Sequence, residues 1–258
     1  MAKRPAYTIL GRGRWAHRMG AILAGEGREL RFVEETRRRP EEDGAAYRGR
    51  LLETLQATES QVAWLCVPPG DHIAGMLDAA LDAGLHVVVE QPWLMTERET
   101  TRWAERARAR GRIVGVHYEY CLLEGLEMWK REYGSGEGYR FGGVFHHSRS
   151  GHLQLPAMDV LGTHLLSMRE YAVPEAEVGQ VDCGYERADE RRVWLERAGR
   201  REAEIDFLEN EEPLIQRYIG RFEAAMESGS FALDLGFALR VAEEAEKLKE
   251  REEARSSS

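Results

Sequence analysis

The sequence predicts a two-domain α/β protein. A doubly wound parallel sheet is expected over residues 1–117, followed by a smaller α/β (α+β) domain over residues 118–258 with an open, mainly antiparallel sheet. The first half alternates short apolar runs with amphipathic helical patterns, as crossovers between parallel strands do. After residue 117 the pattern changes, because a glycine-rich stretch at 134–138 leads into an extended run with polar positions, without a low-complexity linker.

Buried strands are predicted at regular intervals in the first half. Each is a short apolar run that a turn signal ends, such as the glycines after Leu10 or the prolines after Val67. Runs of this kind without alternation are typical of parallel strands that helices cover on both faces. The predicted strands are residues 6–10, 30–35, 62–67, 86–90 and 112–116.

Helices are predicted between these strands. Apolar residues recur at helical spacing in residues 15–23, 47–55 and 73–81, and Gly84 stands where a helix that ends near 82 needs a glycine. Thr96-Glu97-Arg98-Glu99 forms a capping box, in which the threonine and glutamate side chains bond the free N–H groups of a first turn. It predicts a further helix that runs to about residue 110.

The second half predicts one early strand, one helix, three further strands and two closing helices. The expected strands are residues 139–147, 178–185, 192–198 and 202–208, and the expected helices are residues 158–171, 212–227 and 232–249. We expect the charged and then serine-only end after residue 249 to fray.

Composition limits the function. The 258 residues are 43% hydrophobic and 31% charged, which is typical of a folded globular protein. The net charge of −9 disfavours a nucleic-acid partner, and no apolar run is long enough to span a membrane. Three cysteines (Cys66, Cys121 and Cys183) lack paired spacing and no signal peptide is evident, so we expect buried thiols in a cytoplasmic protein.

A glycine motif follows the first predicted strand. Gly11-Arg12-Gly13-Arg14-Trp15-Ala16 fits G-x-G-x-x-A between a strand and a helix. The first glycine permits a tight turn, the second lets the backbone approach a pyrophosphate, and Ala16 lets helix and strand pack closely. The first helical turn, with Arg14 and Trp15, presents N–H groups to the phosphates. The motif predicts a Rossmann-type domain that binds NAD or NADP; a tight turn without a ligand is the alternative.

The end of the second strand bears on the choice of coenzyme. Glu35 lies about twenty residues beyond Ala16 and is the expected ligand of the adenine ribose hydroxyls, with Glu34 as the alternative after a one-residue shift. A carboxylate there favours NAD, whereas Arg37 and Arg38 are placed to attract the 2′-phosphate of NADP. A solvated loop of arginines is the alternative, and the choice between the two coenzymes stays open.

Several motifs in order along the chain resemble the glucose–fructose oxidoreductase/inositol dehydrogenase family. Its T-P-x-x-x-H turn is matched by Cys66-Val67-Pro68-Pro69-Gly70-Asp71-His72, and its A-L-x-A-G-K-H-V and E-K-P segments by residues 80–92. Gly162-Thr163-His164 matches its later G-x-H. The resemblance implies a two-domain dehydrogenase, a bound nicotinamide dinucleotide, and hydride exchange with a sugar, polyol or related small molecule. It also implies a homo-oligomer, a dimer or tetramer.

The resemblance implies roles for individual residues. Pro68 and His72 are expected to line the nicotinamide side of the coenzyme, and Glu90 of the E-K-P motif to lie beside it. Gln91 stands where the family has its lysine, so this chain can orient a hydroxyl there but cannot titrate. Losing a general acid–base group typically costs about 10²–10⁴ in rate unless another residue replaces it.

His164 is the expected acid or base, because an imidazole titrates near neutral pH and the matching family position faces the cleft. Ser167 replaces the carboxylate that the family has three residues later. His117 and Tyr118 end the last Rossmann strand, where either is placed to replace the lysine. For both histidines the alternative is a hydrogen-bonded side chain inside the fold.

A metal site is not expected. His146, His147 and His152 are close in sequence, but adjacent residues of a strand point to opposite faces. The first functional hypothesis is therefore an NAD(P)-dependent oxidoreductase acting on a small carbohydrate-like or other polar substrate. Gln91 and Ser167 motivate a second, a dinucleotide-binding relative that no longer catalyses and serves as a sensor or partner subunit. A third is cofactor-assisted elimination.

Overall fold

A computed structural model describes residues 4–148, 154–207 and 211–256, and the chain divides into two compact units. Unit 1 comprises Met1–His117 and Tyr218–Gly236, and unit 2 comprises Tyr118–Arg217 and Phe237–Ser258. The chain first crosses between them after His117, where the sequence predicted a domain junction. The later return of residues 218–236 to unit 1 was not predicted, since the sequence analysis assigned them to the second domain.

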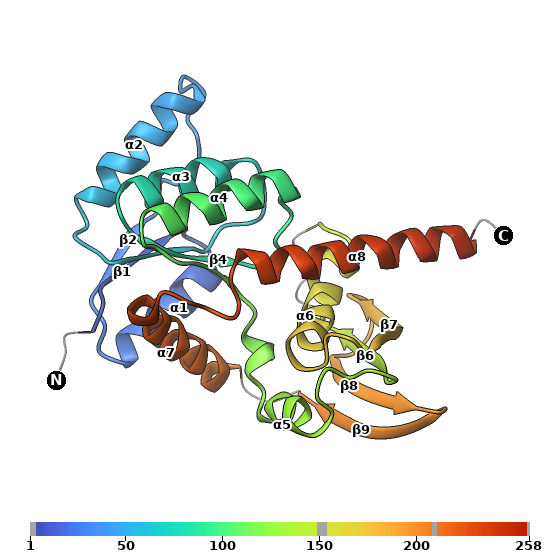
Figure 1. Ribbon diagram of the computed structural model, residues 1–258. Coiled ribbons are helices and arrows are strands. Elements are labelled where there is room, and N and C mark those ends of the chain that lie inside the picture. The colour runs from blue at the N-terminus through green and yellow to red at the C-terminus, as the bar shows by residue number, and fades with distance from the viewer. Residues whose placement is uncertain (1–3, 149–153, 208–210, 257–258) are drawn as a thin grey trace. The chain divides into compact units, whose positions relative to one another are not determined.

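Unit 1 contains a parallel sheet of five strands in the order β2-β1-β3-β4-β5 (Figure 1). Its strands are β1 (Tyr7–Leu10), β2 (Leu30–Val33), β3 (Val62–Leu65), β4 (His86–Glu90) and β5 (Val114–His117). Every residue of β1, β3 and β5 is buried, which explains why these runs lack alternation. The predicted doubly wound parallel sheet is confirmed.

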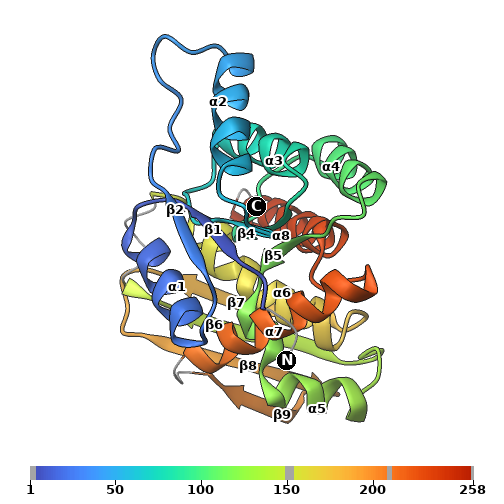
Figure 2. The same cartoon turned by 90° about the vertical axis from the view of Figure 1, so that its left-hand side faces the viewer.

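Helices cover both faces of this sheet. Figures 1 and 2 show α2 (Gly44–Gln56), α3 (His72–Asp82) and α4 (Glu97–Ala109) side by side on one face. The other face is covered by α1 (Arg14–Gly25) and by the part of α7 (Glu212–Ser228) that belongs to unit 1. The predicted capping box begins α4, where the Thr96 side chain accepts from the Glu99 N–H and Glu99 bonds back.

Side chains far apart in sequence attach α7 to the sheet of unit 1. Glu223 accepts hydrogen bonds from the Tyr7 hydroxyl at 2.9 Å and from Arg28 Nε at 2.6 Å. The Tyr218 hydroxyl donates to the carbonyl oxygen of Val116 at 3.1 Å. Burial, followed by the charge of Glu223, raises the pKa of Tyr7 well above its usual value. These contacts are why residues 218–236 belong to the first unit.

Unit 2 contains a four-stranded mixed sheet in the order β7-β6-β8-β9. Its strands are β6 (Arg140–His146), β7 (Glu177–Gly184), β8 (Glu190–Arg197) and β9 (Arg200–Asp206). Only the β6–β7 pair is parallel, so the predicted mainly antiparallel sheet is confirmed. The helices are the short 3₁₀ helix η1 (Glu119–Leu122), α5 (Glu124–Glu132), the π-helical η3 (Met158–Gly162), α6 (Thr163–Ala172) and α8 (Leu235–Ser256).

The two sides of the unit 2 sheet differ in character. One side packs Phe141, Val193 and Leu195 into the apolar core beneath α5 and α6. On the other side the Trp194 ring fills the space above Gly142, and the Arg201 guanidinium lies 4.4 Å from that ring's centroid.

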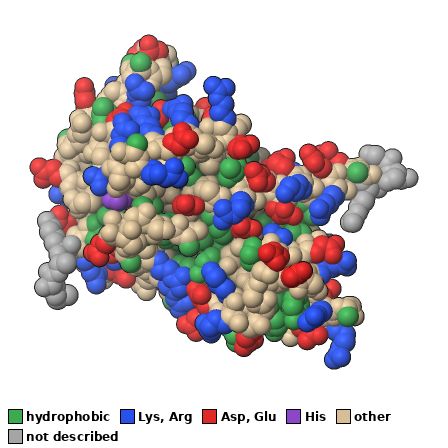
Figure 3. Space-filling view, viewed as in Figure 1, with side chains coloured by type: hydrophobic (Ala, Val, Ile, Leu, Met, Phe, Trp, Pro, Cys, Tyr) green, Lys and Arg blue, Asp and Glu red, His purple; other side chains and the backbone are tan. Residues whose placement is uncertain are grey.

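Figure 3 shows acidic and basic side chains interspersed over the visible face of the molecule. Among the described residues, none of the helices has the length and apolar character needed to cross a membrane.

Candidate functional site

The turn after β1 requires glycine at its first position. Gly11 has φ +142°, and its N–H donates to the Val33 carbonyl oxygen at 3.0 Å. A Cβ atom at Gly11 would lie 2.3 Å from the carbonyl oxygen of Cys66, the residue that follows β3. The glycine therefore lets the turns after β1 and β3 approach closely. Between these two strands the direction of the strand order reverses, and ligands of open α/β sheets bind at such a point.

The start of α1 is suited to an anion. Gly13 is the N-cap residue, is exposed, and would have no atom within 4 Å of an added Cβ. No side chain caps the helix and its first turn holds no acidic residue, so the N–H groups there face no competing negative charge. Arg14 is exposed, Trp15 is half-buried and Ala16 is fully buried against the sheet. These residues fit the diphosphate of a dinucleotide.

Side chains of α2 hold the loop after β2. Arg50 donates to the carbonyl oxygens of Glu35 at 3.0 Å and of Arg37 at 2.9 Å. The Glu35 side chain is 78% exposed, and its Oε2 lies 2.8 Å from Arg39 Nη2. That hydrogen bond and the charge of Arg39 lower the pKa of Glu35. Arg37 is exposed. The expected ribose ligand is thus accessible and ionised, with Arg39 as its partner.

Glu90, at the end of β4, is bonded to groups of the protein itself. Its Oε1 accepts from Trp64 Nε1 at 2.7 Å, and its Oε2 lies 3.1 Å from His117 Nδ1. The Cys66 thiol lies 3.9 Å from the same carboxylate, and burial together with this charge raises the pKa of Cys66 well above its usual value. Cys66 is therefore held as a neutral thiol and is unsuited to nucleophilic chemistry.

His117, at the end of β5, lies beneath the surface. Its side chain has an exposed fraction of 0% and contacts the rings of Tyr218 at 4.7 Å, Trp64 at 5.1 Å and Trp15 at 6.3 Å between centroids. In this arrangement His117 is enclosed by protein side chains, including Glu90 and Trp15. Trp15 belongs to the first turn of α1, so these contacts connect the glycine motif to the end of β4.

The remaining predicted residues of unit 1 lie on loops that follow strands. Pro68 is exposed in the turn after β3, and His72 is half-buried as the first residue of α3. Gln91 directly follows β4 and is half-buried. Because the carboxyl ends of parallel strands share one edge of the sheet, these loops and the glycine motif lie along that edge. How Pro68, His72 and Gln91 act toward a ligand stays a prediction.

The other two predicted residues belong to unit 2. Tyr118 is buried, its ring contacts Phe237 at 5.7 Å, and burial raises its pKa above the ordinary value. His164 follows η3 on α6 and is only 6% exposed. Its ring lies 4.9 Å from that of Tyr120 and 5.5 Å from that of Phe145. The hydroxyl of Ser167 donates to the carbonyl oxygen of His164 at 2.7 Å, so it serves the helix backbone.

Sequence reasoning missed the polar groups around His164. Three polar side chains form hydrogen bonds with one another: Tyr120 of η1, Arg191 of β8 and Glu211, which precedes α7. One signal was available, because the alternation of β8 places Arg191 on the same face as Val193 and Leu195. A cation at an inward position of a strand indicates a buried polar contact.

Groups of side chains able to bind a metal ion can be assessed among the described residues. Among them, no three His, Cys, Asp or Glu side chains are placed to hold one ion. His146 is buried with its Nε2 3.2 Å from Asp182 Oδ1, and the next residue, His147, is half-buried beyond the end of β6. His152 lies outside the described residues.

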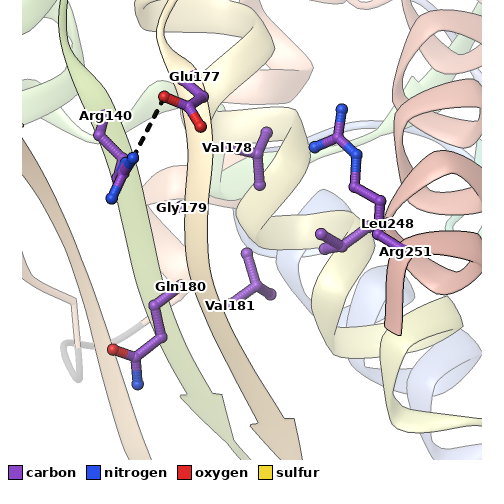
Figure 4. Close-up of a pocket in the computed structure, with 8 residues that line it drawn as sticks. All are labelled: Arg140, Glu177, Val178, Gly179, Gln180, Val181, Leu248 and Arg251. Atoms are coloured by element: carbon purple, nitrogen blue, oxygen red, sulfur yellow. Dashed lines mark hydrogen bonds and ion pairs between the residues drawn. The ribbon is translucent and has the colours of Figure 1, made fainter. Parts of the chain in front are cut away.

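A pocket of about 420 Å³ lies beside β7 and is drawn in Figure 4. None of the predicted site residues lines this pocket.

Comparison with known proteins gives one family and many similar structures. Residues 10–118 match the oxidoreductase family with an NAD-binding Rossmann fold. An inositol dehydrogenase homologue from Azotobacter vinelandii, solved with NADH and myo-inositol, is 16% identical with a TM-score of 0.71, covering 95% of this chain and 94% of that one. A UDP-N-acetylglucosamine 3-dehydrogenase from Acidithiobacillus ferrooxidans is 13% identical with a TM-score of 0.73, covering 94% and 96%. No curated protein matches the sequence. The expected coenzyme, NAD or NADP, agrees with the family's description.

Proposed function

We propose that the chain is an NAD(P)-dependent oxidoreductase of the glucose–fructose oxidoreductase/inositol dehydrogenase family, acting on a small carbohydrate-like or other polar substrate, because residues 10–118 match an oxidoreductase family with an NAD-binding Rossmann fold. The observation that carries the proposal is the turn at Gly11 and Gly13. It combines a glycine that only a close backbone approach explains with an open, acid-free helix start at the point where the strand order reverses. That combination suits a dinucleotide diphosphate.

The residues of unit 1 divide the binding of the coenzyme among them. Backbone N–H groups of the first turn of α1 hold the diphosphate, and the Glu35 carboxylate accepts from the adenine ribose after exchanging its contact with Arg39. Pro68 and His72, at the next strand end, line the nicotinamide side. Glu90 stabilises this part of the site from the interior, because one of its oxygens is bonded to Trp64 and the other to His117. His117 is therefore a positioning residue in this proposal.

When bound, the nicotinamide supplies the hydride acceptor or donor. In the oxidation of a secondary alcohol, the hydride leaves the carbon and the hydroxyl proton must go to a base as the carbonyl forms. By the family resemblance, Gln91 stands at the position of a residue that orients the substrate oxygen, and His164 at the position of an imidazole that takes the proton. The reverse direction returns that proton. Because an amide does not titrate, the pH dependence of turnover is assigned to His164 alone.

Single-turnover mixing tests the proposal. Wild-type protein is mixed with NADH or NADPH and a panel of ketoses, keto-sugars and keto acids, and coenzyme absorbance is followed. We expect oxidation of the coenzyme with at least one substrate, and loss of that rate by 10²-fold or more in His164→Ala with coenzyme affinity unchanged. An unchanged rate in His164→Ala would remove the mechanism. Calorimetry that shows no binding of either coenzyme at millimolar concentration would remove the whole proposal.

A second function is favoured by the side chains that replace the family's titrating groups. Gln91 stands for the lysine, and Ser167 stands for a carboxylate but bonds the backbone of its own helix. Both replacements suit a relative that binds the dinucleotide without turnover. The variant Gln91→Lys separates the two. A site that once used lysine should gain hydride transfer, whereas an active site tuned to glutamine should lose it.

A further inference from the structure

A buried polar cluster lies in the core of unit 2. The Tyr120 hydroxyl donates to Glu211 Oε1 at 2.5 Å and accepts from Arg191 Nη1 at 2.6 Å. Arg191 Nη1 lies 2.9 Å from the same Glu211 oxygen, which closes a triangle of three groups. Tyr120 and Arg191 are 2% and 7% exposed, and Phe145 and Phe207 pack against the Tyr120 ring.

This cluster is costly for the fold. A guanidinium taken out of water loses several kcal/mol of hydration, and the attraction of nearby carboxylates only partly offsets that loss. The Nε of Arg191 is buried and has no hydrogen-bond partner among the described residues, which adds to the cost. An apolar residue at position 191 would continue the face that Val193 and Leu195 form. A contribution to stability therefore does not explain the arginine.

The cluster borders His164. The Tyr120 ring meets the imidazole edge-to-face at 4.9 Å, and the Phe145 ring lies 5.5 Å from it. The Arg191 guanidinium lies against both of these rings, 5.8 Å and 5.1 Å from their centroids. One aromatic layer thus separates the buried cation from the histidine. The hydroxyl that fixes the first ring is the one that Arg191 and Glu211 share.

We propose that Arg191 and Glu211 form a positioning pair for His164: anchored on the Tyr120 hydroxyl, they hold the ring that borders the imidazole and balance the charge around it. The proposal rests on the proposed function for the role of His164 as the proton acceptor. Neither Arg191 nor Glu211 touches the reacting atoms in this proposal. Both act through Tyr120.

The signs of the two charges make the proposal specific. The charged groups that act on Tyr120 are Glu119 beside it in η1, Glu211 and Arg191; Cys121 of η1 also packs near α6 through Ser167. Removing the cation leaves two carboxylates at the Tyr120 ring that borders His164, which favours the imidazolium. Removing Glu211 leaves the cation and favours the neutral ring. A purely structural pair would lower stability in both cases without moving the titration of His164 in opposite directions.

The test is an NMR titration of coenzyme-free protein labelled with ¹⁵N-histidine. The His164 signal is the one that His164→Gln removes. We expect its titration midpoint to rise in Arg191→Gln and to fall in Glu211→Gln, each by about one pH unit. In Tyr120→Phe the charges remain but the ring loses its anchor, so the ring proton shifts of His164 should change. Glu211→Gln is nearly isosteric, so it decides the question alone should Arg191→Gln not fold.

Arg187→Gln is the matched control, since Arg187 is an exposed residue of the same unit and pairs with Asp182 at 3.0 Å. Its His164 midpoint should equal that of the wild type. Midpoints that move in the same direction in both variants, or not at all, would overturn the proposal. A wild type that binds no coenzyme would sink the proposed function instead, while the titration would still judge the pair by itself.

Discussion

The candidate residues of unit 1 and those of unit 2 are placed by different kinds of interaction. In unit 1 the turn at Gly11 and Gly13 offers backbone N–H groups in open space, and its requirements are local to one turn and one strand end. In unit 2, the rings of Tyr120 and Phe145 border His164 and Arg191 lies against both rings, and three separate segments contribute these residues. A backbone site can be recognised in a short motif, whereas a side-chain site depends on packing between distant residues.

The largest effect expected is at the glycine turn. Gly11→Ala places a Cβ against the Cys66 carbonyl oxygen and forces alanine into φ +142°, so we expect unit 1 to lose about 3 kcal/mol or more and coenzyme binding to be lost. Gly13→Ala meets no atom within 4 Å and should keep the thermal midpoint while weakening coenzyme binding. Thermal unfolding and calorimetry on both variants measure this. Equal stability of the two variants would contradict the assignment of the close approach to Gly11.

We expect low pH to reduce the stability of unit 1 through His86, which lies at the start of β4. At the start of β4, burial and then the charge of Arg112 lower the pKa of His86 to about 4. The unfolded chain takes up that proton near pH 6.5, so stability is complete above this pH and falls as the pH drops toward 4, by at most about 3 kcal/mol.

His86→Asn is the variant that tests this slope, because its amide oxygen can still accept from the Ile113 N–H, as His86 Nδ1 does at 3.2 Å. Denaturant unfolding at pH 7, 5.5 and 4.5 should show a shallower loss in the variant than in the wild type. Parallel curves would mean that His86 is not the titrating group.

Two carboxylates, the half-buried Glu90 and the exposed Glu177, are expected to differ in their effect on stability. Glu90→Gln weakens the contacts with Trp64 and His117, and we expect a loss of about 1–3 kcal/mol with a change in tryptophan emission. Glu177→Gln removes an exposed partner of Arg140, 3.5 Å away, and should change the stability by under about 0.5 kcal/mol. Urea titrations followed by fluorescence measure both. A larger loss in Glu177→Gln would reverse the ranking.

A further expected effect concerns the choice of coenzyme. Glu35→Gln removes the ribose ligand and releases Arg39 for a 2′-phosphate, so the ratio of affinities should shift from NADH toward NADPH by about tenfold. Glu41→Gln changes the same loop charge without the contact to Arg39 and serves as the control. Calorimetry with both coenzymes gives the ratio. A shift of the same size in the control would assign the effect to loop charge alone.

Particular residues show which structural elements the sequence could predict. The capping box at Thr96 and the Gly84 stop predicted helix ends that the structure contains, because caps depend on residues within one turn. Strands β1, β3, β4 and β5 were recognisable because nearly all of their residues are buried on both faces of the sheet. Helices η1 and α5 were missed, since α5 begins after Leu123 without a side-chain cap and contains Gly125 near its start. No local pattern marks such a beginning.

By itself, the sequence determined the parallel sheet of unit 1, the glycine turn and the match of residues 10–118 to an oxidoreductase family with an NAD-binding Rossmann fold. Tertiary structure alone decided that residues 218–236 return to unit 1, that His117 lies beneath the surface bonded to Glu90, and that Arg191 borders His164 through Tyr120. The reason is physical. Turns, caps and strand periodicity depend on neighbours along the chain, whereas buried polar contacts join residues that meet only when the whole core forms.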